Sequence, residues 1–387
     1  EIDETRLRVG CGVKWGSLEQ DVIGAWVADM DFGIPPAVRE KVIEVTERQD
    51  FGYPFWRDGD PVVRAFEDRM QHRYQWNPQP ERTRIFTDLI QILQVIIEHA
   101  TQPGDGIAIH VPSYPPFLAS IERSGRKIIP LPMANSDSGW IFSTENLTQM
   151  LRDHGCTMLV LVNPHNPTGR VFTNSELQAL SDVAEELDLT ILADEIHADL
   201  IFSPYVHIPF ASLSNTIAAR TITATSATKA FNIAGMRCAV AHIGSERVWN
   251  RLEREPLDYF GTPSILSRVA TVTAWNESEE WLVELLKQLE RNRRLISEWV
   301  ETSGIDPNYR SPEATYLSWI DFMNSPLNHN DPAADILRLG KVPLSQGEEF
   351  SRYCNVDTTS FVRINFATSE ASLQVILDRL DIALQRA

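Results

Sequence analysis

Residues 158–194 read MLVLVNPHNPTGRVFTNSELQALSDVAEELDLTILAD, and this stretch decides the fold. It begins and ends in short, continuous apolar runs, at 158–162 and 190–193, which are typical of strands buried on both faces of a sheet. Between these runs the apolar side chains have helical spacing, and Thr173 with Glu176 matches the capping box that begins a helix. A strand, a helix and a second strand in this order predict a parallel sheet covered by helices.

The alternation of strands and helices continues on both sides of this stretch, from about residue 83 to residue 243. We expect an α/β fold with a mostly parallel sheet, helices on both faces, and ligands at the carboxyl ends of the strands. The further strands expected here are 107–110, 221–224 and 238–243, and the expected helices are 143–154 and 173–187.

The pattern changes after residue 243, where long helical stretches replace the alternation. This change predicts a smaller α+β domain beside the large one. We expect the large domain to span 46–285 and the small one to combine 1–45 with 286–387, because the first 45 residues hold no core-sized element of their own. The elements expected after residue 243 are helices at 245–255, 264–275, 279–302 and 369–385 and strands at 315–320 and 361–366.

The charge balance and the cysteines exclude several classes of partner and site. The 387 residues include 35 Lys and Arg against 53 Asp and Glu, a net charge of −18, which repels phosphate backbones and argues against nucleic-acid binding. No apolar run approaches the roughly 20 residues that span a bilayer, so we expect no membrane partner. The four cysteines are far apart and the N-terminus is acidic without an apolar stretch. We therefore expect a cytoplasmic protein without disulfides.

Three polar segments follow predicted strands and supply candidate site residues. Lys229 stands in SATKAFN just after one strand, although most lysines are solvated surface groups. Asp194 directly follows a second strand, where Asp is also common as a helix N-cap. Asn166 lies in NPHNPTG after a third strand, in a turn whose two Asn-Pro steps fix an outward-pointing amide. All three lie at strand ends, where ligands bind in such sheets.

A metal site is the alternative interpretation of the segment that begins at Asp194. Glu195, His197 and Asp199 follow closely, and carboxylates and imidazoles bind metals. These residues are contiguous rather than spaced to face one ion, and no H-E-x-x-H pattern occurs. We therefore expect no metal.

The three segments occur in the order N-P-x-N-P-T-G, D-E and S-x-x-K. In this order the sequence resembles the fold type I pyridoxal-phosphate enzymes of the class I/II aminotransferase family, and within them it is most similar to the cystathionine β-lyase, or C–S lyase, branch. The resemblance runs from about residue 14 to the end of the chain. It implies pyridoxal 5'-phosphate as cofactor, a mostly parallel seven-stranded sheet, an amino-acid substrate and a homodimer with shared active sites. The other matching segments are 26–32, 35–36, 51–53, 112–117, 194–200, 229–235, 313–319 and 363–367.

The resemblance implies how five side chains surround the cofactor ring. Lys229 holds the cofactor as a Schiff base and, once substrate releases it, removes the α-proton, which requires a lowered pKa. Asp194 pairs with the pyridine nitrogen and keeps it protonated, and Asn166 donates to the phenolic oxygen. Tyr114 lies against the ring face. His197 stands where many aminotransferases have a Tyr that touches the ring oxygen, and the lyase-like branch commonly has this His.

The resemblance also implies the groups that bind the phosphate of the cofactor. Ser226 and Arg237 supply a hydroxyl and a cation. Backbone amides at Ile90 and Gln91, near the start of a helix, supply further donors. Tyr53 reaches the phosphate from the partner subunit, which is why shared active sites are expected.

The α-carboxylate of the substrate is expected at Arg363, because guanidinium binds carboxylate with two parallel hydrogen bonds. The alternative is that Arg363 is an ordinary surface residue of its strand, but its apolar flanks favour a functional role. Backbone groups at Ala28 and Asp29 are expected near the same carboxylate. Asn166 and Tyr114 are expected to contact the substrate as well as the cofactor.

The phosphate-binding turn departs from the family pattern. Relatives usually have a glycine there, whereas residues 87–91 read TDLIQ. We expect the carboxylate of Asp88 and the side chain of Leu89 to weaken cofactor binding or to reshape the loop. Arg237 is more usual in standard aminotransferases, so it favours that branch over the lyases.

Two reactions use the same residues. In the β-elimination we favour, Lys229 removes the α-proton, a thiolate leaves the β-carbon, and cystathionine or another cysteine S-conjugate yields pyruvate, ammonia and a thiol. In the alternative, transamination, the amino group passes to a 2-keto acid. A regulator that keeps the fold without activity is a third hypothesis, against which the intact set of Lys229, Asp194, Asn166 and Arg363 argues.

Overall fold

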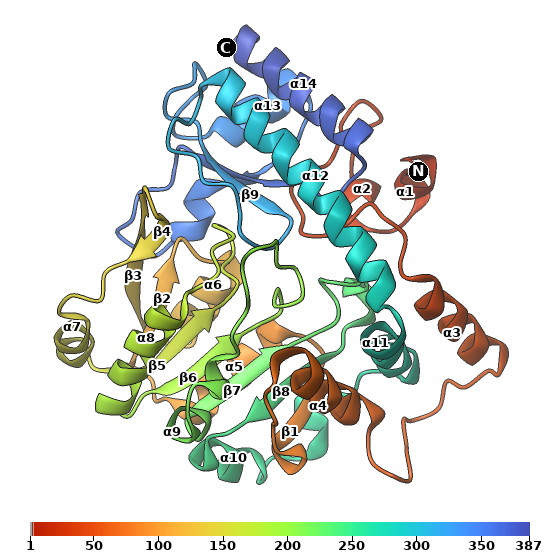
Figure 1. Cartoon of the computed structure of the whole chain (residues 1–387), viewed down its shortest axis with the longest axis vertical. Helices are drawn as coiled ribbons and strands as arrows, with labels where there is room; N and C mark the ends of the chain where they lie inside the picture. Colours follow the sequence, from red (N-terminus) through yellow and green to blue (C-terminus); the bar gives the residue numbers. More distant parts are fainter. Residues whose placement is uncertain (1, 3) are drawn as a thin grey trace.

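The computed structural model of the chain describes residues 2 and 4–387. Its larger sheet has the strand order β1-β8-β7-β6-β5-β2-β3-β4 (Figure 1). The neighbours from β3 to β7 pair in parallel, whereas β8 is antiparallel to both β7 and β1. The mostly parallel α/β sheet is therefore confirmed. The strands are β1 (Thr83–Phe86), β2 (Gly106–Val111), β3 (Lys127–Ser136), β4 (Gly139–Phe142), β5 (Cys156–Val162), β6 (Thr190–Asp194), β7 (Thr221–Thr225) and β8 (Ala239–Ile243).

The sheet has eight strands, so the expectation of seven is wrong by one. The additional strand is β4, which continues from β3 in an antiparallel hairpin and pairs Met133 with Phe142. The strand β3 has no continuous apolar run either, because its buried positions Ile129, Leu131 and Met133 alternate with more exposed ones. Such alternation is typical of a strand with one face in the core and one toward solvent.

Successive side chains of the central strands point to opposite faces of the sheet, as the two-residue period of a strand requires. In β5, Met158 and Val160 pack with α5, α6 and α10, whereas Leu159 packs with α7, α8 and α9. The sheet is thus buried between two helical layers. The helices on these faces are α5 (Leu89–Ala100), α6 (Pro115–Arg123), α7 (Leu147–Asp153), α8 (Asn174–Glu186), α9 (Asn215–Ala218) and α10 (Glu246–Leu252).

The capping box predicted at the start of α8 is confirmed. The side chain of Thr173 accepts a hydrogen bond from the N–H of Glu176 at 3.3 Å, and the carboxylate of Glu176 accepts one from the N–H of Thr173 at 2.7 Å. These bonds satisfy two amide groups that a helix start leaves without intrahelical partners.

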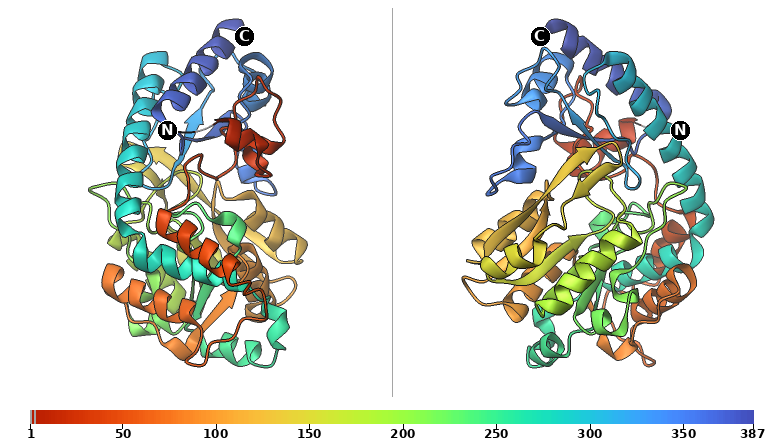
Figure 2. Two further views of the ribbon diagram at one scale, coloured as in Figure 1. Left: turned by 90° about the vertical axis from the view of Figure 1, so that its right-hand side faces the viewer. Right: turned by 60° about the vertical axis from the view of Figure 1, so that its left-hand side comes forward.

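A second, antiparallel sheet lies beside the carboxyl ends of the larger one (Figure 2). It contains β10 (Ser345–Gln346), β11 (Phe361–Asn365) and β9 (Leu317–Asp321), in that order. Residues near the N-terminus bond to this part, since Ala25 donates to the carbonyl oxygen of Pro343 and accepts from the N–H of Asn365. The helices α1 (Glu4–Val9), α2 (Val13–Gly16), α13 (Pro332–Gly340) and α14 (Glu370–Arg386) lie nearby.

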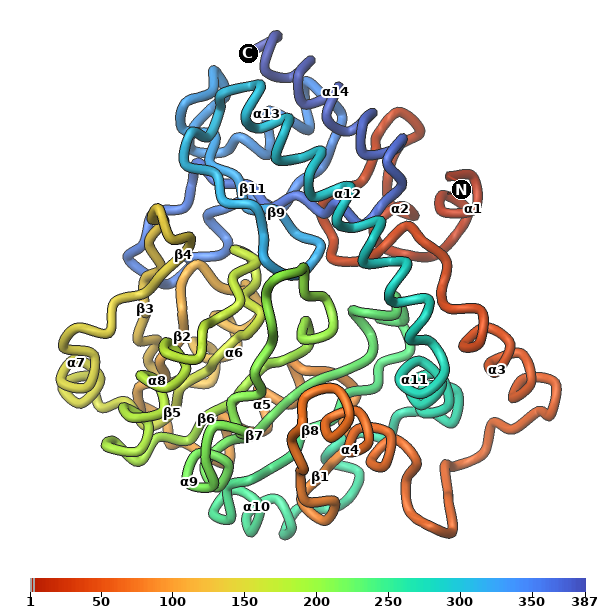
Figure 3. Tube along the Cα trace, in the orientation of Figure 1, coloured from red at the N-terminus to blue at the C-terminus, as the bar shows by residue number. Residues whose placement is uncertain are grey.

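One long helix, α12 (Glu279–Ser303), joins the two parts of the molecule (Figure 3). It follows α11 (Ile265–Glu277), which packs against α3 (Pro36–Glu47) and α4 (Pro61–Tyr74). The domain boundary that we predicted at residues 285 and 286 falls inside α12, and the division into 46–285 and the remainder stays a proposal. Among the helices of residues 2 and 4–387, none combines the length and apolar character that crossing a bilayer requires.

Candidate active site

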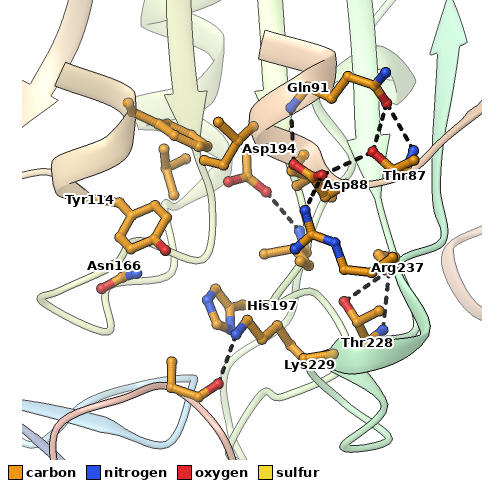
Figure 4. Close-up of a pocket in the computed structure, with 18 of the residues that line it drawn as sticks. Thr87, Asp88, Gln91, Tyr114, Asn166, Asp194, His197, Thr228, Lys229 and Arg237 are labelled. Carbon is orange, nitrogen blue, oxygen red and sulfur yellow. Dashed lines mark hydrogen bonds and ion pairs between the residues drawn. The ribbon is translucent and has the colours of Figure 1, made fainter. Parts of the chain in front are cut away.

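A cavity of about 420 Å³ lies at the carboxyl ends of β1, β2, β5, β6 and β7 (Figure 4). Parallel strands end at one edge of a sheet, so residues that are distant in the sequence meet there. The predicted site residues that line the cavity are Ala28, Ile90, Gln91, Tyr114, Asn166, Asp194, His197, Ser226, Lys229 and Arg237.

Lys229 follows β7, and its amine is held by hydrogen bonding at the cavity. Its Nζ donates to the carbonyl oxygen of Ala28 at 2.7 Å, and the hydroxyl of Tyr316 donates to the same oxygen at 2.8 Å. Burial lowers the pKa of Lys229, and the cations of Arg363 and Arg237 lower it further against the opposite effect of two carboxylates. A lowered pKa increases the share of neutral amine, which is the form that attacks a carbonyl carbon or accepts a proton.

Asp194 is the last residue of β6, and its carboxylate lines the cavity. One oxygen accepts a hydrogen bond from the N–H of Ile196 at 3.0 Å. Burial raises the pKa of Asp194 to about 7, although the bond from Ile196 and the charge of Lys229 oppose this. A buried carboxylate is stabilised by a cation beside it, and a protonated ring nitrogen is such a cation.

Arg363 reaches from β11 to the loop that follows β5. Its Nη1 donates to Oδ1 of Asn166 at 3.0 Å, and its Nη2 donates to the carbonyl oxygen of Trp26 and to Oγ of Ser345, both at 3.2 Å. Arg363 is 5% exposed, so it is not the surface residue of the alternative interpretation. Burial lowers its pKa to about 10. These partners are uncharged, so the guanidinium keeps its full charge for an incoming carboxylate.

The bond from Arg363 also orients Asn166. With Oδ1 engaged by the guanidinium, the amide NH₂ group of Asn166 is left to donate to a ligand. Tyr114, the N-cap residue of α6, lines the same cavity and has its pKa raised by burial. Figure 4 shows Tyr114 and Asn166 on the side of the cavity opposite Arg237.

His197 is buried beside Lys229, and burial lowers its pKa to about 3. The imidazole is therefore neutral at physiological pH. Its ring lies edge-on to Tyr316, with centroids 6.3 Å apart. Glu195 and Asp199, the other residues of the possible metal site, bond elsewhere. The carboxylate of Glu195 lies 3.1 Å from Nε2 of His207, and the carboxylate of Asp199 forms an ion pair with Arg69 at 2.9 Å.

The end of the cavity predicted to bind phosphate contains Ser226, Arg237 and the first turn of α5. Ser226 Oγ donates to the carbonyl oxygen of Cys238 at 2.5 Å, so its proton is already engaged. Arg237 forms an ion pair with Asp88. The N–H of Gln91, an expected phosphate donor, instead donates to Oδ1 of Asp88 at 3.0 Å. Three of the predicted phosphate contacts, Ser226, Arg237 and the N–H of Gln91, thus each have a partner in their own chain.

Three predicted site residues do not line the cavity. Arg363 stands behind Asn166, as described. The carbonyl oxygen of Asp29 accepts hydrogen bonds from Lys14 at 3.2 Å and from Asn365 at 2.7 Å. Tyr53 is 98% exposed, so within its own chain it contacts no site.

Sequence reasoning missed Thr228 and Tyr316. Thr228 lines the cavity, and its hydroxyl lies 2.9 Å from that of Ser226. The signal was available, because a hydroxyl residue directly precedes Lys229 in SATK. Tyr316 shares the acceptor of Lys229, which depends on a contact between distant segments and has no local signal.

The cavity residues fit pyridoxal 5'-phosphate by their chemistry. The cofactor needs an amine for covalent attachment, a carboxylate for the ring nitrogen and a cation for its phosphate. Lys229, Asp194 and Arg237 supply these groups around one cavity. The buried position of the Asp194 carboxyl at the cavity is the strongest sign of fit, because a cationic ring nitrogen beside it stabilises its ionised form.

Comparison with known proteins agrees with this chemistry. The family model described as aminotransferase class I and II matches residues 21–380. The chain is 33% identical to a cystathionine β-lyase of Corynebacterium glutamicum, with 98% of each chain covered, and 31% identical to the cystathionine β-lyase PatB of Bacillus subtilis, with 99% of each covered. The pyridoxal-phosphate-bound C–S lyase of Staphylococcus hominis superposes with a TM-score of 0.90 at 27% identity, over 100% of this chain and 98% of that one. The chain belongs to the class I and II aminotransferase family of pyridoxal-phosphate-dependent enzymes.

Proposed function

We propose that the protein is a carbon–sulfur β-lyase that converts cystathionine or a related cysteine S-conjugate into pyruvate, ammonia and a thiol. The observation that carries the proposal is the meeting of Lys229 and Asp194 at one cavity, with Arg363 bonded to the cavity residue Asn166. The full-length relatives of the chain include enzymes named cystathionine β-lyase. The same residues also permit transamination. The relatives that are named as lyases favour elimination.

Each residue has a defined task in this reaction. The guanidinium of Arg363 binds the α-carboxylate of the substrate, with Asn166 held beside it at 3.0 Å. This contact places the α-carbon toward the amine of Lys229, which accepts the α-proton at Nζ. The bound cofactor supplies the electron sink that makes this proton acidic. The Cβ–S bond then breaks and the thiolate leaves with its electron pair. The unsaturated amine that remains of the substrate is hydrolysed by water to pyruvate and ammonia.

Asp194 and His197 support the same step without titrating through it. Asp194 holds a proton on the cofactor's ring nitrogen, because a carboxylate within hydrogen-bonding distance favours the charged partner. His197 stays neutral, since burial lowers its pKa to about 3. A neutral imidazole adds no further cation beside Lys229. The pKa of the Lys229 amine is therefore lowered only by burial and by the charges of Arg363 and Arg237.

The experiment is a paired product assay. Protein supplied with cystathionine is expected to release pyruvate and a free thiol in equal amounts. Lys229→Ala is expected to lose both products, whereas Lys287→Ala, which changes an exposed lysine of α12, retains them. Formation of a new amino acid from an added 2-keto acid, without thiol release, contradicts the lyase assignment and favours an aminotransferase. No turnover of either kind favours a regulator.

We also propose that the active form is a homodimer with shared active sites. Exposed apolar side chains gather on the segment between α3 and α4, where Phe51 is 62%, Tyr53 98% and Phe55 83% exposed. Such a patch on a soluble domain is commonly covered by another chain. The predicted role of Tyr53 at the partner's phosphate site gives this patch a function. A cytoplasmic location stays a prediction.

A further inference from the structure

The turn between β1 and α5 is closed by its own side chains (Figure 4). Asp88 is the N-cap of α5, and its Oδ1 accepts a hydrogen bond from the N–H of Gln91 at 3.0 Å. Its Oδ2 accepts from the hydroxyl of Thr87 at 3.0 Å and forms the ion pair with Nη2 of Arg237. The carboxylate therefore bridges the helix start and the nearest cation of the cavity.

The side chain of Gln91 completes the closure. Its Oε1 accepts a hydrogen bond from the N–H of Thr87 and lies within reach of the Thr87 hydroxyl, both at 2.9 Å. A phosphate group at this end of the cavity needs N–H, O–H and guanidinium donors. The N–H and hydroxyl of Thr87, the N–H of Gln91 and Nη2 of Arg237 already serve oxygens of the chain itself.

We propose that Asp88 is an internal competitor of the cofactor's phosphate group, so that the cofactor binds by displacing the Asp88–Arg237 ion pair. This inference rests on the proposed function only in placing the phosphate at this turn. Arg237 is able to move, because its side chain is 62% exposed, whereas Asp88 is 21% exposed and is fixed by its helix cap. The guanidinium therefore turns to the phosphate, and the Asp88 carboxylate stays as a like charge beside it.

The consequence is a cofactor affinity that the chain's own charge weakens. One like charge near ion-pair distance in a partly solvated site changes a dissociation constant by about tenfold. The effect is expected to be largest on the phosphate, because Asp88 is paired with Arg237, whereas Tyr114 and Asn166 lie on the opposite side of the cavity from Arg237 (Figure 4).

The test compares two ligands and three proteins by equilibrium titration of cofactor-free protein. The ligands are pyridoxal 5'-phosphate and pyridoxal, which lacks the phosphate. The proteins are the unaltered chain, Asp88→Asn and Asp331→Asn. Asn is as good an N-cap as Asp, so the first variant removes the charge and keeps the helix start. Asp331 caps α13 by accepting a hydrogen bond from the N–H of Ala334 at 3.0 Å. Asp331→Asn is therefore a matched control, because it removes one capping charge outside the cavity.

Asp88→Asn is expected to bind pyridoxal 5'-phosphate about tenfold more tightly and pyridoxal with unchanged affinity. Asp331→Asn is expected to bind both as the unaltered chain does. Equal phosphate-ligand affinity in all three proteins overturns the inference, as does an equal gain for both ligands. If Asp88→Asn unfolds, Asp88→Ser keeps a capping side chain and serves instead.

The outcomes separate this inference from the proposed function. Binding of pyridoxal 5'-phosphate with the predicted difference, but without release of pyruvate from cystathionine, supports the role of Asp88 and refutes the lyase. Pyruvate release with no difference between the variants supports the lyase and refutes the role of Asp88.

Discussion

At the scale of single residues, burial sets the properties of the two cavity groups that matter most for the chemistry. It lowers the pKa of the Lys229 amine and raises that of the Asp194 carboxyl to about 7. Both shifts favour the neutral form, because a low-dielectric surrounding disfavours charge. A cationic cofactor ring favours the ionised form of Asp194 and not that of Lys229. The ionisation of Asp194 therefore differs measurably between the protein with and without cofactor.

The contribution of Asp194 to the stability of the cofactor-free protein is therefore expected to fall as pH rises. The pKa of Asp194 is raised in the folded state, so its contribution is fully present below the unfolded pKa, near 4, and is lost as pH rises through about 7. The loss approaches about 4 kcal/mol for a shift of this size. Thermal unfolding of both proteins between pH 5 and pH 8 checks it, because the stability of the unaltered chain relative to Asp194→Asn is expected to decrease as pH rises. An unchanged dependence in that variant contradicts the assignment.

Substrate recognition by Arg363 makes a second prediction at this scale. Arg363→Gln removes the charge that binds the α-carboxylate, and truncating one partner of a buried charge pair costs about 2–5 kcal/mol. We expect KM for cystathionine to rise at least about thirtyfold, with the affinity for pyridoxal 5'-phosphate unchanged. Steady-state kinetics measure it, and Arg352→Gln, at an exposed arginine, is the control. An unchanged KM refutes the role of Arg363.

At the scale of elements, the loop after β5 is fastened to the segment before β9 by a buried ion pair. Nη1 of Arg170 lies 2.8 Å from Glu313 Oε2, which also accepts from the N–H of Val171 at 2.7 Å. The same loop carries Asn166, which lines the cavity. The pair thus holds a site residue of one sheet against the chain that leads into the other.

Breaking this pair is expected to destabilise the fold. Glu313→Gln leaves the charge of Arg170 partly uncompensated, and such losses cost about 3–5 kcal/mol when the partner is buried. Glu176 lies 3.0 Å from Arg170 and retains part of the pairing, so we expect about 2–3 kcal/mol. Denaturant unfolding measures the difference, with the exposed Glu348→Gln as control. A loss no larger than that of the control contradicts this account.

The elements also show which features sequence patterns predict. The strands β5, β6 and β7 are continuous apolar runs because both their faces are buried, and the polar residues that follow them reach one cavity. The strands β1, β3 and β4 lack such runs. The resemblance implied seven strands, and β4 is the additional strand of the eight-stranded sheet. The bonds from Arg237 to Asp88 and from Arg363 to Asn166 join segments about 150 and 200 residues apart, and no local pattern predicts them.

At the scale of the whole molecule, the cavity lies at the carboxyl ends of strands of the larger sheet, and the second sheet lies beside those ends (Figure 2). The residues proposed to bind the cofactor ring and phosphate follow strands of the larger sheet, and Arg363, proposed to bind the substrate, lies on β11 of the smaller one. The exposed segment around Tyr53 leaves a further contact for a second copy of the chain.

Shared active sites predict recovery of activity on mixing. Lys229→Ala and Tyr53→Ala homodimers are each expected to be weakly active, whereas mixed dimers contain one site with both native residues. Unfolding and refolding an equal mixture is expected to restore up to about one quarter of native activity, because half of the dimers are mixed and each has one intact site of two. Recovery is measured by pyruvate release. A monomer in sedimentation, or no gain on mixing, refutes shared sites.

The central claim is that Lys229 is the covalent anchor of pyridoxal 5'-phosphate, and borohydride reduction tests it most directly. The reagent fixes a Schiff base as a stable amine, and digestion followed by mass spectrometry locates the modified lysine. We predict the cofactor on the peptide that contains Ser226–Asn232, at Lys229, and no modification in Lys229→Ala. Cofactor fixed to another lysine, or to none, contradicts the account.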